Sequence, residues 1–158
     1  MKKIIFLCFI LGLAILEESF LSDFRIFGVS ADMLLIALVV SSLFFRFGWA
    51  LVFSIFAGLL RDCFSNNVFG FNMILFAFLS LLIIRISREI PIESAFLRII
   101  LVFIITFLYI LISGIIFISL GRFIPLGIFL HKLFLAPIFT AAVSWIIFKL
   151  SESINLKC

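Results

Sequence analysis

The sequence predicts an all-α integral membrane protein with about six transmembrane helices, several of them short, in a single polytopic domain (residues 1–158). Hydrophobic residues make up 66% of the 158 positions, and only 13% are charged. A soluble domain carries about 25% charged residues, so composition alone indicates a membrane protein. Spans of about 20 residues leave room for five or six helices and no separate soluble domain. Long apolar runs such as LRIILVFIITFLYILISGIIFISL do not alternate with polar residues, which argues against an outer-membrane β-barrel.

The first expected helix covers about residues 4 to 21, after Lys2 and Lys3. Gly12-Leu13-Ala14 resembles the small residues that end a signal peptide, so a cleaved leader is the alternative. We favour an uncleaved helix because the remaining chain is also apolar. Glu17 and Glu18 are then expected to be solvated charges near its outer end.

The stretch from Asp32 to Asn72 predicts a helical hairpin that supplies the second and third helices. Two apolar runs flank a single charge, Arg46; Asp32 lies 14 residues before it and Asp62 lies 16 after it. At ~1.5 Å per residue each arm is about 20 to 25 Å long, shorter than the ~30 Å hydrocarbon core. With Arg46 at the turn, the two carboxylates should lie at nearly the same height.

Three more helices are expected, at about residues 68–84, 97–120 and 128–150. The first is followed by Arg85 and Arg88 and by the polar connector SREIPIES, in which proline disfavours helix at the residue before it. The second is the most apolar, and the turn GRFIPLG leads into the third.

The placement of Lys and Arg predicts cytoplasmic termini, because cytoplasmic loops are enriched in these residues. Six helices place eight of the 12 basic residues on the side of the termini: Lys2, Lys3, Arg46, Arg85, Arg88, Arg98, Lys149 and Lys157. The other four lie on the opposite side: Arg25, Arg61, Arg122 and Lys132. Asp32 and Asp62 therefore belong to the outer leaflet.

Two expected helices carry a stripe of small residues that leads to a charge. In the third helix the stripe is Ala50, Ser54 and Gly58, and its next position is Asp62. In the sixth helix it is Ala136, Thr140 and Ser144, and the preceding position is Lys132. Small residues at this spacing let helices pack closely in lipid. Both stripes should be buried, and Asp62 and Lys132 could then be buried at the same level and form a pair.

The two aspartates differ in how easily the helix dipole explains them. Asp32 opens a helix, where a carboxylate is favoured as an N-cap, whereas Asp62 closes one, where negative charge is disfavoured by about 0.3 to 1 kcal/mol. A charge at the bilayer centre costs roughly 2.5 to 3.5 kcal/mol, so Asp62 should have a specific role. Asn72, just after Gly70, is expected to hydrogen-bond across helices near the same level.

No set of residues with the pattern of an active site emerges. The chain lacks a Ser/His/Asp arrangement, an HExxH motif and a phosphate-binding loop. An aspartate pair makes intramembrane aspartyl proteolysis conceivable, but the flanking AD and RDC do not match it. We therefore expect no enzymatic activity, metal, cofactor or nucleic-acid binding. The three cysteines are far apart and are expected to be unpaired thiols: Cys8, Cys63 and Cys158.

Three segments resemble the bacterial rod shape-determining protein MreD family. They are Gly28-Val-Ser-Ala-Asp-Met-Leu-Leu35, Ala57-Gly-Leu-Leu-Arg-Asp-Cys-Phe-Ser65 and Phe69-Gly-Phe-Asn72. The family shows G-V-x-P-D-L-L, then G-L-L-x-D-x-x-S, then P-L-G-x-x. The match covers about residues 26 to 85, and Ala31 and Phe69 depart from the usual Pro and Leu.

The resemblance implies a non-enzymatic inner-membrane component of the cell-wall elongation machinery. Such proteins act with the bitopic partner MreC and, through it, with the actin-like MreB and the peptidoglycan synthases. The family fold is thought to resemble substrate-binding subunits of energy-coupling-factor vitamin transporters, which supplies the alternative function. A small channel is a third possibility, but the fifth helix lacks a polar face. Our hypothesis places a partner segment in an outer-leaflet polar groove formed by Asp32, Arg61 and Asp62.

Overall fold

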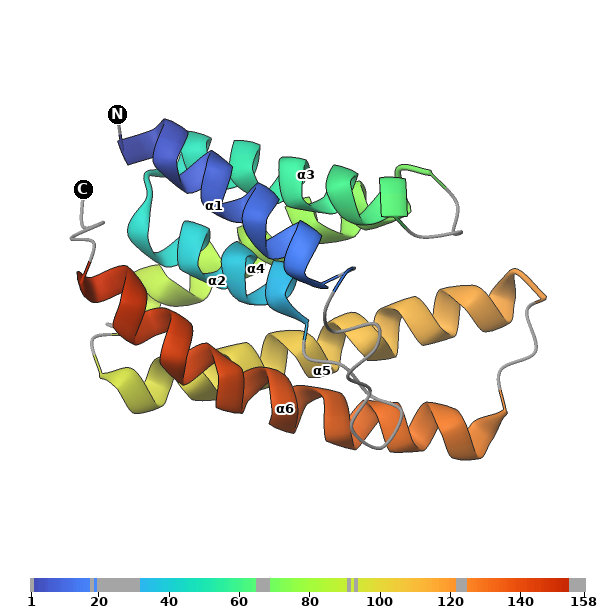
Figure 1. Ribbon diagram of the computed structural model, residues 1–158. Helices are drawn as coiled ribbons and strands as arrows, with labels where there is room; N and C mark the ends of the chain where they lie inside the picture. The colour runs from blue at the N-terminus through green and yellow to red at the C-terminus, as the bar shows by residue number, and fades with distance from the viewer. Residues whose placement is uncertain are drawn as a thin grey trace.

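The computed structural model describes residues 2–17, 19, 32–64, 69–90, 92, 94–121 and 125–153. In this part of the chain every regular element is an α-helix, which confirms the all-α class. The six helices are α1 (Lys2–Leu16), α2 (Met33–Phe44), α3 (Phe47–Phe64), α4 (Phe71–Glu89), α5 (Ala95–Ser119) and α6 (Leu126–Ser153). In Figure 1, α1 begins and α6 ends at the same end of the bundle, which we call the α1-start end.

The helix boundaries follow local signals in the sequence. Phe45 and Arg46 separate α2 from α3, as the hairpin predicts. α4 continues to Glu89, past the expected end at about residue 84. Ser94 caps α5: its Oγ accepts a hydrogen bond from the Leu97 amide at 3.2 Å. The expected end of the first helix at residue 21 lies outside the described residues, and α1 itself ends at Leu16.

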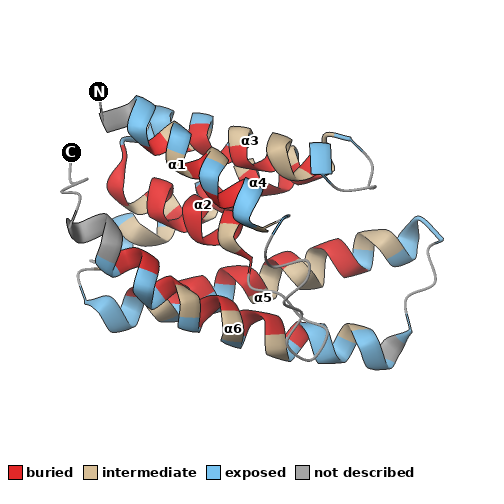
Figure 2. Cartoon of the chain, viewed as in Figure 1, coloured by how far each residue is buried: buried red, intermediate tan, exposed pale blue. Residues whose placement is uncertain are grey.

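α2 lies at the centre of the bundle and packs against every other helix. Six consecutive residues, 35 to 40, are at most 1% exposed, so all sides of the helix are covered. Figure 2 shows this burial along most of α2. A helix that is apolar all round is stable only when it is enclosed. Enclosure also explains how a helix of 12 residues, about 18 Å long, is accommodated, because protein rather than lipid surrounds it.

Four helices are long and apolar enough to cross a membrane: α3, α4, α5 and residues 127–149 of α6. Their outward faces carry large exposed apolar side chains, for example Ile74 at 72% and Phe96 at 72% exposed. Such faces suit lipid, where apolar surface carries no hydration cost. The chain is therefore a membrane protein, with α1 and α2 as shorter apolar helices.

α3 and α4 form an antiparallel pair (Figure 1) whose backbones are in close contact at Gly58. A Cβ atom on Gly58 would lie 2.7 Å from both the Asn72 carbonyl oxygen and the Met73 Cα. Both contacts are to backbone, which cannot move without shifting α4. Ala50 and Ser54, on the same face of α3, are fully buried. The small-residue stripe thus lies against neighbouring helices.

We expect Gly58→Ala to destabilise the protein by about 2 to 3 kcal/mol, because the added methyl group forces α3 away from α4. Gly48→Ala is the matched control in the same helix, since nothing lies within 4 Å of its Cβ position. That change should be neutral or stabilising by up to about 1 kcal/mol. The SDS fraction at which half of the far-UV helical signal is lost measures both. Equal midpoints for the two variants would show that the close approach is not required.

Candidate functional site: a buried polar cluster

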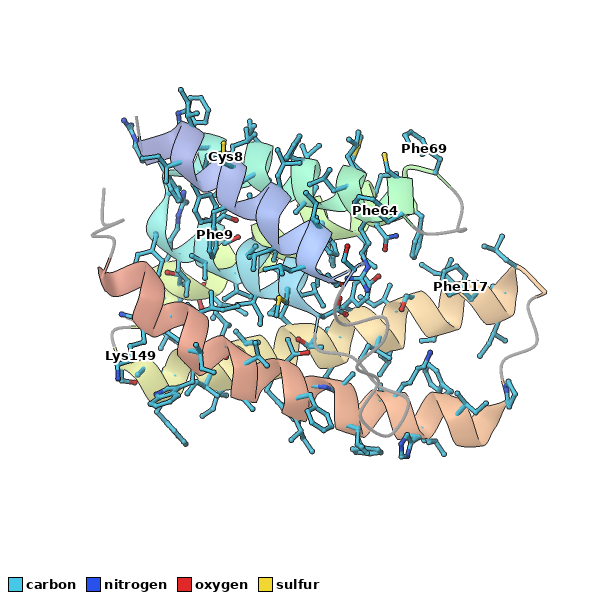
Figure 3. All side chains as sticks on the ribbon, viewed as in Figure 1. Cys8, Phe9, Phe64, Phe69, Phe117 and Lys149 are labelled. Atoms are coloured by element: carbon cyan, nitrogen blue, oxygen red, sulfur yellow. The ribbon has the colours of Figure 1, made fainter. Side chains whose placement is uncertain are left out.

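Polar side chains from the end of α1, the start of α2 and helices α3 to α6 meet away from the α1-start end, level with the middle parts of α5 and α6 (Figure 1). We call them the polar cluster: Glu17, Asp32, Arg61, Asp62, Asn72, Tyr109 and Thr140. They lie where α1 and α3 end and where α2 and α4 begin, beside the middle parts of α5 and α6. Figure 3 shows oxygen and nitrogen atoms gathered between α3 and α5 in this region.

Asp62 caps the N-terminus of α4 from the last turn of α3. Its carboxylate is bound by backbone amides of Gly70 (3.0 Å), Asn72 (3.1 Å) and Met73 (3.1 Å). The Asn72 side-chain amide donates a fourth hydrogen bond at 2.9 Å. The first amides of a helix have no partner within it, and a carboxylate is favoured there by the helix dipole. Asp62, only 5% exposed, therefore has a structural role within the chain.

Gly70, just before α4, has the backbone conformation in which the first amides of the helix donate to Asp62. Gly70 is the N-cap residue and has φ of +91°, a left-handed conformation that other residues adopt only with strain. Asn72, in turn, connects α4 to α5: its Oδ1 accepts a hydrogen bond of 2.7 Å from the Tyr109 hydroxyl. The expected cross-helix bond of Asn72 is thus formed, with Tyr109 as the partner.

Arg61 lies between two carboxylates and two aromatic rings. Its Nη1 donates to Asp32 and, at 3.5 Å, to Glu17. The guanidinium carbon is 4.9 Å from the ring centre of Tyr109 and 5.9 Å from that of Phe76. Ring faces attract cations most strongly where water is excluded. Arg61 therefore joins the end of α1 and the start of α2 to α3, α4 and α5.

Glu17, and not Asp32, caps α2. Glu17 Oε2 accepts a hydrogen bond of 3.0 Å from the Leu34 amide. Asp32 occupies the N-cap position of α2, but its side chain makes no capping hydrogen bond and pairs with Arg61 instead. The Asp32 amide donates to Thr140 Oγ1 at 3.1 Å, which ties α2 to α6. The expectation that the Asp32 side chain caps its own helix is wrong, because this carboxylate pairs with the half-buried Arg61 charge.

The same type of helix cap thus occurs twice. A carboxylate at the end of α1 caps α2, and a carboxylate at the end of α3 caps α4. In each case the acidic residue lies at the end of its own helix, where the dipole disfavours it, and is held by the start of the next helix, where the dipole favours it. Each cap ties the end of one helix to the start of the next, α1 to α2 and α3 to α4.

The structure places the predicted site and packing residues largely as expected, and Lys132 is the exception. Asp32 and Asp62 lie at the same end of the bundle, in one network through the adjacent Arg61. In the stripe of α6, Ala136 is 6% exposed, and Thr140 and Ser144 are fully buried. Lys132, at the head of that stripe, is exposed. Among the described residues it makes no ion pair, so the expected Asp62–Lys132 pair is not formed.

Two members of the polar cluster were not expected from the sequence. The sequence predicts Glu17 to be a solvated charge. However, Glu17 follows the last residue of α1, where the helix dipole disfavours a carboxylate as it does at Asp62. That unfavourable position indicates a binding partner outside its own helix. Tyr109 is the single tyrosine of the chain and lies inside its most apolar helix. A buried tyrosine hydroxyl normally has a hydrogen-bond partner, so its position was also informative.

The chemistry available to the polar cluster is ionic and hydrogen-bonding. The side chains of Arg61 and Glu17 are 22% and 16% exposed, whereas Asn72 is 1% exposed. No group of three or more His, Cys, Asp or Glu residues that could hold a metal ion occurs among the described residues. Arg61 and Glu17 are therefore the most exposed members of the polar cluster, followed by Asp32 at 12%.

No protein-family model matches the chain, and neither a curated protein nor a solved structure shows significant similarity to it.

Proposed function

We propose that this protein is a non-enzymatic inner-membrane component of a bacterial cell-wall elongation complex, similar to MreD, that binds a bitopic MreC-like partner. One observation carries the proposal. Residues of the three MreD-like segments meet in one largely buried network, in which Asp32, 29 residues before Arg61 in the chain, joins Arg61, Asp62 and Asn72. Motif residues that meet in space are better explained by one shared role than by chance.

The geometry supports a modified form of the groove hypothesis. Asp62 and Asn72 are occupied in holding α4, so they shape the site from within. The partly exposed pair of Arg61 and Glu17 is the part that a partner segment would contact. A polar group on a transmembrane partner would gain a charge-assisted hydrogen bond there, in surroundings of low dielectric. Through the partner, the protein would act with MreB-like filaments and peptidoglycan synthases.

The proposed orientation places the α1-start end in the cytoplasm of a bacterial cell. Arg46, Arg85, Arg88 and Lys149 all lie towards this end, and Figure 3 shows Lys149 there. Arg61 and Lys132 lie towards the other end, where, within the described part of the chain, basic residues are fewer. This asymmetry follows the rule that cytoplasmic ends are enriched in Lys and Arg. The polar cluster then belongs to the outer half of the bilayer.

The alternative proposal is the substrate-binding subunit of an energy-coupling-factor transporter. It rests on the resemblance expected between the folds of the two families and on the presence of a polar cluster inside a six-helix bundle. In this case Arg61 would bind an anionic group of a vitamin instead of a protein segment.

Affinity purification from native membranes in mild detergent tests both proposals, with the full chain as bait. We expect recovery of a bitopic partner together with wall-synthesis proteins. Glu17→Gln should lower that recovery several-fold, whereas Lys132→Gln, an exposed charge towards the same end, should leave it unchanged. Recovery of two ATPase subunits and a membrane coupling protein would instead identify the transporter subunit. Unchanged recovery of the bitopic partner by Glu17→Gln would place its binding surface elsewhere.

A further inference from the structure

A second feature lies at the opposite end of the bundle, where α3 begins and α4 ends. A cavity of about 480 Å³ opens there, with apolar and charged residues on its walls. The apolar ones are Phe47, Leu81 and Ile84, and the charged ones are Arg85, Arg88 and Glu89. None of these residues belongs to the polar cluster, so the cavity needs an explanation of its own.

The charged wall of this cavity favours an anion. Arg85 and Arg88 are exposed, and neither forms an ion pair within the described part of the chain. With Glu89 the wall keeps one net positive charge, and the exposed Arg46, next to Phe47, adds another. The cavity also borders the first turn of α3, whose dipole is positive at that end. Two guanidinium groups three residues apart can bind the oxygens of one phosphate group.

The apolar wall continues as a track along the outside of α4. Ile74, Phe78 and Leu81 are 72%, 53% and 44% exposed, and they follow one another at helical spacing on one face. The next positions along this face are Arg85 and Arg88. From Ile74 to Arg85 the helix rises by about 16 Å, close to half of the ~30 Å hydrocarbon core. An apolar track one leaflet deep, with two arginines at its end, has the dimensions of one phospholipid.

The level of the cavity in the membrane agrees with this match. Trp49 lies in the first turn of α3, and Trp145 lies near the end of α6, with Lys149 5.5 Å from its ring centre. Both tryptophans of the chain are thus towards the α1-start end and are exposed, at 43% and 54%. Tryptophan is enriched at the membrane–water interface. The arginines therefore lie at the depth of lipid headgroups.

We propose that this cavity binds an anionic phospholipid, with its phosphate between Arg85 and Arg88 and an acyl chain along Ile74, Phe78 and Leu81. Basic pockets between membrane helices are a recurrent way of holding such headgroups. The bound lipid would bridge the start of α3 and the end of α4. The proposal does not depend on the function proposed for the polar cluster at the other end of the bundle.

Native mass spectrometry of the full-length protein, purified in a neutral detergent, tests the proposal. The probes are phosphatidylglycerol, phosphatidylcholine with the same acyl chains, and glycerol phosphate. We expect phosphatidylglycerol to be retained at a concentration at least tenfold lower than phosphatidylcholine, and glycerol phosphate not to be retained. Equal retention of the two lipids would overturn the charge argument. Retention of glycerol phosphate as tight as that of phosphatidylglycerol would reduce the site to an anion site.

Variants locate the binding on the protein. The double variant R85Q/R88Q should abolish the preference for phosphatidylglycerol, and L81E should weaken binding at least tenfold by placing a carboxylate in the acyl track. The matched control K132Q/K149Q removes the same amount of charge outside the cavity and should keep the preference. All the substituted side chains are exposed, so the fold should survive, and far-UV circular dichroism checks this. An equal loss in R85Q/R88Q and K132Q/K149Q would show non-specific charge attraction and overturn the proposal.

Discussion

Asp62→Ala is expected to destabilise the protein by about 3 to 5 kcal/mol. The change leaves three backbone amides and the Asn72 side-chain amide without their acceptor. Each buried donor that loses its partner costs about 1 to 3 kcal/mol, and some of this is regained by local rearrangement. α4 would also lose the carboxylate that caps its N-terminus, so its first turn should fray and its packing against Gly58 should loosen.

SDS-induced unfolding, followed by far-UV circular dichroism, measures the effect. Glu89→Ala is the matched control, because Glu89 is an exposed carboxylate at the other end of α4. It should move the midpoint by less than about 0.5 kcal/mol. If Asp62→Ala instead unfolds at the wild-type midpoint but loses a binding partner, Asp62 contacts the partner directly and does not act by holding α4.

Arg61→Met is the change with the second large expected effect, about 3 kcal/mol. It retains much of the apolar stem but removes the cation between Asp32 and Glu17. Breaking a buried ion pair by removing one partner typically costs 3 to 5 kcal/mol, because the remaining charge is left unpaired. The Arg61 side chain is 22% exposed, so water offsets part of this cost and the lower end of the range applies.

A variant that is neutral at all three positions separates charge pairing from packing. Adding Glu17→Gln and Asp32→Asn to Arg61→Met removes the two carboxylate charges along with the cation. We expect the unfolding midpoint to return at least halfway to the wild-type value, because neutral amides are less costly to bury unpaired than carboxylates. Lys132→Met is the control for the loss of an exposed basic residue. If the triple variant is as unstable as Arg61→Met alone, the cation–π contacts with Tyr109 and Phe76 carry the stabilisation.

Composition and hydrophobic runs were sufficient to predict the all-α membrane class and the six helices. The hairpin turn at Arg46 also followed, because a charge between two apolar runs costs least at a turn or outside the membrane. Small residues spaced four apart predicted which faces of α3 and α6 are buried. These are local properties, set by hydrophobicity and helical period, and they act before any helix meets another.

The partners of the charges were decided by the tertiary structure. The sequence showed that Asp62 lies at the end of a helix, where the helix dipole disfavours its charge. It did not show that the first amides of α4 would donate hydrogen bonds to this carboxylate. Lys132 has the same spacing as the buried stripe of α6, yet it is exposed. Helical spacing predicts which residues share a face of a helix, but not which part of that face a neighbouring helix covers.

Glu17 is the opposite case, a charge that was expected to be solvated and that instead has a partner within the chain. Next to Leu16 it was indistinguishable from a solvated flanking charge, and only the start of α2 beside it makes it a cap. The sequence by itself thus determined which segments become helices, which faces turn inward and where charges are costly. Which charge meets which group depended on contacts between residues far apart in the chain, and such contacts form only when the helices pack around α2.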